Sequence, residues 1–136
     1  MNGLVSVVAP GLTSAPVPLQ SGATPLAVAG TVGSLALFLS VTGHIAARNV
    51  LGDVSPRDAV GIGPLPAAIA TLPPTFGVNP LLAIVAAVAV DLGAIKYLYG
   101  REWRLTAYIT FIHVVVSIIL GAVLVSLALL LSTAPI

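Results

Sequence analysis

Residues 55–80 read SPRDAVGIGPLPAAIATLPPTFGVNP and contain two helix starts with a turn between them. Ser55 and Asn79 are residue types that cap helix N-termini, and each is followed by a proline, which suits the first helical position. The intervening PPTFGV at residues 73–78 is typical of a turn. The pattern therefore predicts one helix over about 56–72 and a second over about 80–98.

The composition excludes most classes of soluble protein. Of the 136 residues, 58% are hydrophobic and 7% are charged, whereas about a quarter of the residues of an ordinary soluble domain carry a charge. Because so few charges cannot solvate a globular surface, we exclude a soluble enzyme domain, a coiled coil and a disordered tail. A net charge of +1 leaves no basic footprint for nucleic acid. The lipid bilayer is therefore the expected partner of most of the chain.

The charged residues gather in two short windows, at residues 48–58 and 96–104, and Asp91 alone lies outside them. A helix that crosses the hydrocarbon core of a bilayer needs about 20 residues. The charge-free intervals are residues 1–47, 59–90 and 105–136, and each is long enough for at least one crossing.

The outer intervals complete the expected fold. A threonine followed by a proline marks the start of a helix over about 24–47, and residues 103–132 are expected to form one long helix that is tilted or protrudes from the bilayer. With the two central helices, this predicts an all-α bundle of four transmembrane helices, arranged as two antiparallel hairpins in one membrane domain over 24–136. Residues 1–23 are interpreted as an irregular extracytoplasmic tail.

The helix expected over 56–72 is short for a crossing, about 26 Å long at about 1.5 Å per residue. It also contains two glycines and two prolines between residues 61 and 66, so we expect it to be kinked or partly unwound. The alternative is a re-entrant segment, which would place the two charged windows on opposite membrane faces. Four full crossings place all the cations on one face.

The cations then indicate the orientation, because short cytoplasmic loops carry an excess of Lys and Arg. We therefore expect a multi-pass protein of the cytoplasmic membrane with both termini outside the cytoplasm. The expected anchors at the cytoplasmic face are Arg48, Arg57, Lys96, Arg101, Arg104 and Trp103.

Two ionisable residues are expected at similar depth in the membrane. Counting along the helices, Asp91 lies about 13 Å from the turn at Gly100, and His113 lies about 15 Å from Trp103. A short turn makes their helices antiparallel neighbours, which predicts a contact between the two side chains. The whole predicted polar cluster is Asp91, His113, His44, Thr110 and Ser117, and the small residues predicted to pack helices together are Gly33, Gly43, Ala83, Ala87 and Gly121.

This cluster has two interpretations. Polar side chains between membrane helices often serve only as interhelical hydrogen bonds, but an intramembrane acid is costly and is a functional hypothesis by default. We therefore predict a non-enzymatic structural or accessory component that packs with itself or with a larger membrane complex. The alternative is an oligomeric proton or cation conductor that uses Asp91 and His113.

Enzymatic, metal and cofactor sites have no support in the motifs. The chain has no cysteine, and it lacks a His-Glu-x-x-His motif, a Gly-x-Ser-x-Gly motif and a phosphate-binding loop. His44, Asp91 and His113 offer three metal ligands in principle, but at no spacing typical of a metal site. We therefore expect no cofactor, no bound metal and no catalytic residue.

Two segments resemble a known family, HIAARNVLGDV at residues 44–54 and AVGIGPLPA at residues 59–67. They are similar to a family of small, uncharacterised multispanning membrane proteins of halophilic archaea, and the similarity extends over roughly residues 24–125. The resemblance implies a prokaryotic cytoplasmic membrane. It implies no role for any residue, because the family carries no established activity.

Overall fold

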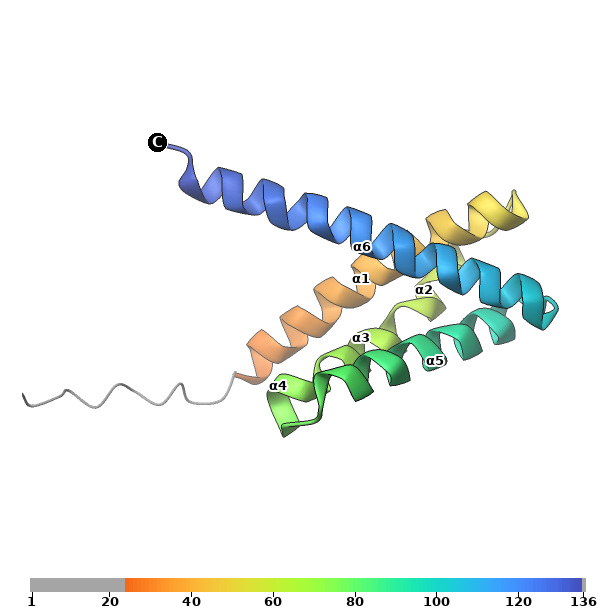
Figure 1. Cartoon of the computed structure of the whole chain (residues 1–136), viewed down its shortest axis with the longest axis horizontal. Coiled ribbons are helices and arrows are strands. Elements are labelled where there is room, and N and C mark those ends of the chain that lie inside the picture. The colour runs from red at the N-terminus through yellow and green to blue at the C-terminus, as the bar shows by residue number, and fades with distance from the viewer. Residues whose placement is uncertain (1–23, 136) are drawn as a thin grey trace, which may run out of the picture.

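The computed structural model describes residues 24–135, and for residues 74 and 75 it describes the main chain only (Figure 1). These residues form helices and turns, with no strand among them. The helices are α1 (Pro25–Leu51), α2 (Pro56–Ile62), α3 (Pro64–Ala70), α4 (Leu72–Phe76), α5 (Pro80–Tyr99) and α6 (Trp103–Thr133). The predicted tail at residues 1–23 lies outside the described residues.

Three of the helices begin at a side-chain cap followed by a proline. Thr24 Oγ1 accepts a hydrogen bond from the amide of Ala27 at 3.2 Å before α1. Ser55 and Asn79 accept in the same way before α2 and α5. The caps satisfy amide groups that have no partner within the helix, and the proline costs nothing because its missing N–H is not needed there.

The segment that follows Ser55 corrects the single helix expected over 56–72. It consists of three short helices, α2, α3 and α4, which are separated at Gly63 and Thr71. Gly63 keeps a helical backbone, with φ −69° and ψ −43°, so the chain direction is roughly maintained. Pro64 and Pro66 lack the amide hydrogens that would bond to the preceding turn, and the regular helix is interrupted for that reason. We refer to α2, α3 and α4 together as the broken segment.

The chain runs back and forth along one axis (Figure 1). The turns at residues 52–55 and 100–102 lie at one end, called here the charged end because the two charged windows, at residues 48–58 and 96–104, surround these turns. The turn at residues 77–79 lies at the opposite end, called the far end. The broken segment therefore runs from the charged end to the far end, antiparallel to α1 and α5.

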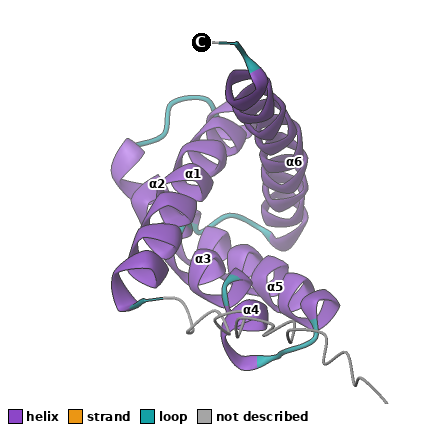
Figure 2. Cartoon of the chain, turned by 90° about the vertical axis from the view of Figure 1, so that its left-hand side faces the viewer, coloured by secondary structure: helices purple, strands orange, loops and turns teal. Residues whose placement is uncertain are grey.

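Viewed end-on, α1, the broken segment, α5 and α6 are arranged as a ring (Figure 2). The helix α1 contacts α2, α3 and α6, while α5 contacts the broken segment and α6. Within the described residues, no close main-chain contact links α1 with α5 or α3 with α6. Each segment thus packs against its two neighbours in the ring.

The fold contains three of the four membrane-spanning helices that the sequence predicts. Within residues 24–135, three helices are long and apolar enough to cross a membrane: α1, α5 and α6. The broken segment is not among them, because none of its helices has the length of a span. The chain is therefore all-helical with three candidate membrane helices, and it is not a regular four-helix bundle.

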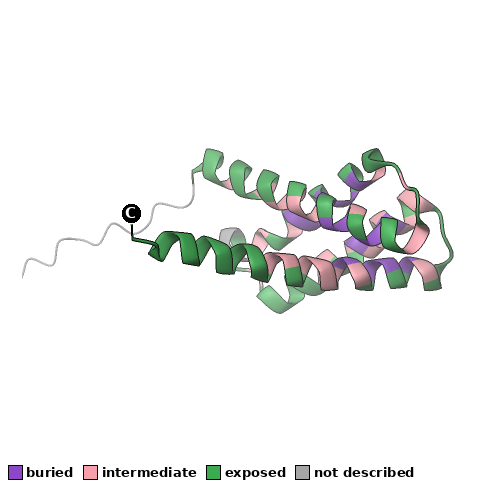
Figure 3. Cartoon of the chain, turned by 90° about the horizontal axis from the view of Figure 1, so that it is seen from above, coloured by how far each residue is buried: buried purple, intermediate pink, exposed green. Residues whose placement is uncertain are grey.

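The packed core lies in the half of the molecule near the charged end (Figure 3). Its fully buried members are Ala46, Ala47, Ile62, Ile95 and Ile109. In contrast, α6 is exposed from residue 122 to its end, and most of α1 before residue 35 is exposed as well. Within residues 24–135, the outer parts of α1 and α6 therefore extend beyond the packed core.

One glycine sets the distance between the broken segment and α1. A Cβ atom added at Gly63 would lie 2.0 Å from the carbonyl oxygen of Ala36 and 2.4 Å from Ser40 Oγ. No side chain fits at that distance, so the two backbones are in direct contact at this point. The contact holds Pro66 and Ala67, which are both buried, against the middle of the molecule.

Candidate functional site

A buried ion pair between an aspartate and a histidine lies between α5 and α6. Asp91 on α5 is 4% exposed and His113 on α6 is 2% exposed. His113 Nδ1 lies 2.7 Å from Asp91 Oδ2. The structure thus brings together the two residues whose contact the sequence predicts, because the short turn at residues 100–102 makes their helices antiparallel neighbours and sets the two residues at matching depth.

The other ring nitrogen of His113 reaches α1. Nε2 lies 3.0 Å from the carbonyl oxygen of Leu39 and 3.0 Å from Thr42 Oγ1. A carbonyl oxygen can only accept, so Nε2 must carry a hydrogen. Ser117 Oγ donates to Thr42 Oγ1 at 2.9 Å, and Thr42 donates in turn to the carbonyl of Phe38 at 3.1 Å. One imidazole therefore joins α1, α5 and α6.

The contact between Asp91 and His113 allows two positions for one proton. Either Nδ1–H of a protonated His113 donates to the Asp91 carboxylate, or a protonated Asp91 donates to Nδ1 of a neutral His113. In both cases Nε2–H remains bonded to Leu39, and the pair has no net charge. A neutral pair avoids the cost of an isolated charge, about 2.5–3.5 kcal/mol at the centre of a membrane helix.

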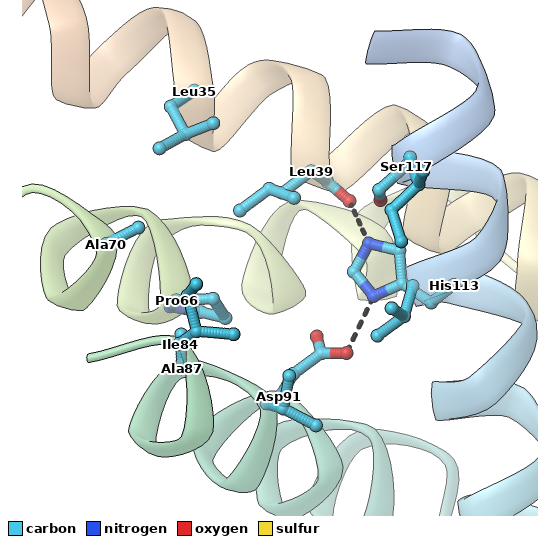
Figure 4. Close-up of a pocket in the computed structure, with 12 residues that line it drawn as sticks. Leu35, Leu39, Pro66, Ala70, Ile84, Ala87, Asp91, His113 and Ser117 are labelled. Carbon is cyan, nitrogen blue, oxygen red and sulfur yellow. Dashed lines mark hydrogen bonds and ion pairs between the residues drawn. The ribbon is translucent and has the colours of Figure 1, made fainter. Parts of the chain in front are cut away.

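An apolar cleft of about 270 Å³ lies beside this pair, between α1, α3, α5 and α6 (Figure 4). All four segments contribute to its wall, through residues such as Leu35 of α1, Pro66 of α3, Ile84 of α5 and Ile118 of α6. Asp91 Oδ1 is buried and has no hydrogen-bond partner. Figure 4 shows this oxygen turned toward Pro66 and Leu39, into the cleft.

The remaining members of the predicted polar cluster differ in their placement. Ser117 joins the network through Thr42. Thr110 does not, because its hydroxyl donates to the carbonyl of Thr106 on its own helix at 3.0 Å. The half-buried His44 has a buried Nδ1 without a hydrogen-bond partner, and no hydrogen bond links it to the pair.

The small residues predicted to pack helices also differ. A Cβ at Gly43 would lie 3.2 Å from Ile62 and 3.5 Å from His113 Nε2, so Gly43 gives both side chains their space. Ala83 is buried, and Ala87 lines the cleft. Gly33 has no neighbouring atom within 4 Å, and the nearest to Gly121 is a Phe38 atom at 3.8 Å. Within residues 24–135, Gly33 and Gly121 therefore make no close helix contact.

Three parts of the site are not among the residues predicted from the sequence. Thr42 and the Leu39 carbonyl hold the histidine ring, and Gly63 holds the broken segment against α1. A signal for Thr42 was present in the polar and small run at residues 40–44 of an otherwise apolar helix. The glycine before a proline at Gly63 was interpreted only as a break, although it is also a close approach of two backbones.

The predicted cytoplasmic anchors lie at the charged end. The ammonium group of Lys96 lies 5.1 Å from the centre of the Trp103 ring, and it also donates a hydrogen bond to the carbonyl of Arg101. This cation–π contact closes the turn between α5 and α6. Arg48, Arg57, Arg101 and Arg104 are exposed.

A metal centre has no basis among the described residues. In residues 24–135, no three side chains of His, Cys, Asp or Glu are grouped so that they could hold an ion. Asp91 and His113 are in contact, but His44 does not join them as a third ligand.

Comparison with known proteins places the chain in a family without an assigned activity. No curated protein and no solved structure matches the chain. Residues 22–135, which are more than half of the chain, match a family described as a family of unknown function, DUF7473. The protein with this buried Asp91–His113 pair therefore belongs to the DUF7473 family.

Proposed function

We propose that this protein is a four-pass integral protein of a prokaryotic cytoplasmic membrane that acts as a non-enzymatic structural or accessory component. The broken segment supplies the fourth crossing, since it runs from the charged end to the far end. The charged end faces the cytoplasm, because the cations lie in its short turns and in the helix ends beside them. Both termini then lie on the outer side.

The observation that carries the accessory role is the unpartnered groove between α1 and α6. Ala27, Gly30, Thr31 and Ser34 form one wall, and Gly121 lies on the other. Small residues at spacings of three and four let another helix approach closely, which is how membrane helices associate without a hydrophobic driving force. Among the described residues no side chain packs against this wall at Gly30, since no atom lies within 4 Å of a Cβ added there.

We propose a second copy of the chain as the occupant of this groove. Each copy offers an apolar helix that extends beyond its own core, because residues 122–133 of α6 are exposed and belong to a long apolar helix. A symmetric dimer can exchange these extensions, so that the same surface serves both copies. A helix of a larger membrane complex is the other occupant that the groove would admit.

If two copies associate through this groove, larger side chains on its wall should weaken the dimer. Gly30→Leu and Ser34→Leu should lower the dimer fraction by about tenfold or more, because a side chain on the wall prevents close approach. Gly93→Leu is the matched control, since Gly93 also has no neighbour within 4 Å but lies on α5, away from the groove. Light scattering of the protein in mild detergent measures the oligomeric state. A monomeric wild type, or equal loss in all three variants, would contradict the proposal.

A proton or cation conductor is the second candidate, favoured by the buried Asp91–His113 pair. A mobile proton on a neutral pair is the chemistry that a relay needs. Within the described residues, however, the hydrogen bonds that lead from the pair end at Ser117 and at main-chain carbonyls of α1. Because, within residues 24–135, these hydrogen bonds do not continue toward either end of the molecule, the accessory role is favoured over conduction.

Reconstitution separates the two candidates. If the protein conducts protons, the interior of liposomes that contain it should acidify under a proton gradient, as reported by a trapped pH dye. Asp91→Asn should abolish this flux, because an amide cannot exchange the proton. We expect no flux above that of empty liposomes. A flux that depends on Asp91 would replace the accessory role with the conductor.

A further inference from the structure

The cleft beside Asp91 has the composition of a site for an apolar molecule. Its wall is formed almost entirely by aliphatic side chains from the four segments, and Asp91, His113 and Ser117 are its polar members. Its volume of about 270 Å³ exceeds the roughly 150 Å³ of an apolar cavity that binds benzene. Ala70, Ile84 and Ile118 line it and are exposed, so the cleft opens on the surface that faces lipid in the proposed topology.

One atom in this wall lacks a partner. Asp91 uses Oδ2 for His113, and its Oδ1 is buried without a hydrogen bond. Leaving a buried carboxyl oxygen unsatisfied is costly, and native proteins rarely do so without a functional reason. The Oδ1 atom is turned into the cleft, as Figure 4 shows, so a molecule in the cleft can donate to it.

The charge of the pair selects the chemistry of the donor. Because Asp91 and His113 are together neutral, a cationic ligand would bring an uncompensated charge into hydrocarbon, which is unfavourable. A neutral hydroxyl supplies the one missing hydrogen bond and adds no charge, and a hydroxyl bond to a carboxylate is among the stronger kinds. The aliphatic wall accepts the rest of the molecule.

We propose that the cleft binds a neutral alcohol dissolved in the membrane, with its hydroxyl donating to Asp91 Oδ1 and its hydrocarbon chain against Leu35, Ile84 and Ile118. The site lies between the four segments of one chain; it shares Leu35 with the groove between α1 and α6 but includes none of the small residues of the groove wall. Binding in the cleft therefore does not require self-association.

Photolabelling tests this site with the whole protein in lipid nanodiscs. The probe is an octanol that carries a diazirine, and the competitors are 1-octanol and octyl methyl ether, which lacks the donor. We expect label at the cleft residues, identified by mass spectrometry, to be displaced by octanol about tenfold more effectively than by the ether. A tenfold preference corresponds to about 1.4 kcal/mol. Equal competition would overturn the proposal, because it would show simple partition into the lipid.

Variants assign the preference to the carboxyl oxygen. Asp91→Asn should keep the preference for octanol, since its amide carbonyl still accepts while its NH₂ donates to His113 Nδ1. Asp91→Leu should remove it. Ala70→Phe fills the mouth of the cleft without touching the pair, and it should remove cleft labelling even if Asp91→Leu does not fold. A preference for octanol that survives Ala70→Phe or a folded Asp91→Leu would also overturn the proposal.

Discussion

Replacing Gly63 by alanine should destabilise the folded protein by about 3 kcal/mol or more. The added methyl group would lie 2.0 Å from the carbonyl oxygen of Ala36, which is a main-chain atom and cannot rotate away. The broken segment would have to move off α1, and the buried Pro66 and Ala67 would move with it. The decrease in the free energy of unfolding reports how much the fold depends on the close contact between Gly63 and the backbone of α1.

Thermal unfolding in a mild detergent checks this result. Gly93→Ala is the matched control, because Gly93 lies in the interior of α5 and no atom lies within 4 Å of its Cβ position. Alanine there should be neutral or stabilising by up to about 1 kcal/mol, since glycine is a poor helix former. If Gly63→Ala melts at the same temperature as Gly93→Ala, the contact between the broken segment and α1 is not as described.

Replacing His113 by leucine should cost about 3 kcal/mol, the second large effect. The histidine is the partner of Asp91 and also bonds to Leu39 and Thr42, so its removal leaves a buried carboxyl group without a hydrogen bond. Leucine has a similar volume, and the loss is therefore mainly polar. Asp91→Asn should cost less, about 1 kcal/mol, because an amide can still donate to Nδ1.

The double variant Asp91→Leu/His113→Leu isolates the interaction between the two residues. Removing both polar groups eliminates the unpaired carboxyl, so the double variant should be more stable than His113→Leu alone. Phe111→Leu is a control on the same helix, since Phe111 is exposed and takes no part in the pair. A double variant that is less stable than His113→Leu by the full cost of a second independent substitution would show that the two residues do not interact.

The local signals in the sequence were sufficient to predict the starts of α1, α2, α5 and α6 and the approach of Asp91 to His113, but not the starts of α3 and α4. A cap and a proline act within a few residues, and the depth of Asp91 and His113 follows from counting along two helices joined by a short turn. The expected end of the first helix at residue 47 was too early, because the helix continues to Leu51 and stops at Gly52 with φ 83°. The first charged residue does not mark the end of this helix, because a helix can extend past the edge of the hydrocarbon.

The broken segment shows where local signals are ambiguous. The PPTFGV stretch predicts a turn, yet Pro73 and Pro74 lie in the first positions of α4, where proline is tolerated. The contacts of Gly63, Thr42 and the Leu39 carbonyl depend on how α1 is rotated against two other segments. No periodicity within one helix contains that information, so these parts of the site required the structure.

The central claim is that the chain crosses the membrane four times, with the charged end in the cytoplasm. Cysteine labelling tests it directly, because the chain has no native cysteine. Asp53→Cys and Glu102→Cys place thiols at the two turns of the charged end, and Phe76→Cys places one at the far end, at a position that is 73% exposed. Phe76 is preferred to Gly77, whose φ of 67° disfavours a side chain.

A membrane-impermeant maleimide added to intact cells should label the cysteine at position 76. The cysteines at positions 53 and 102 should react only after the membrane is permeabilised. Labelling of positions 53 and 76 from the same side, or of positions 53 and 102 from opposite sides, would contradict the four-crossing arrangement.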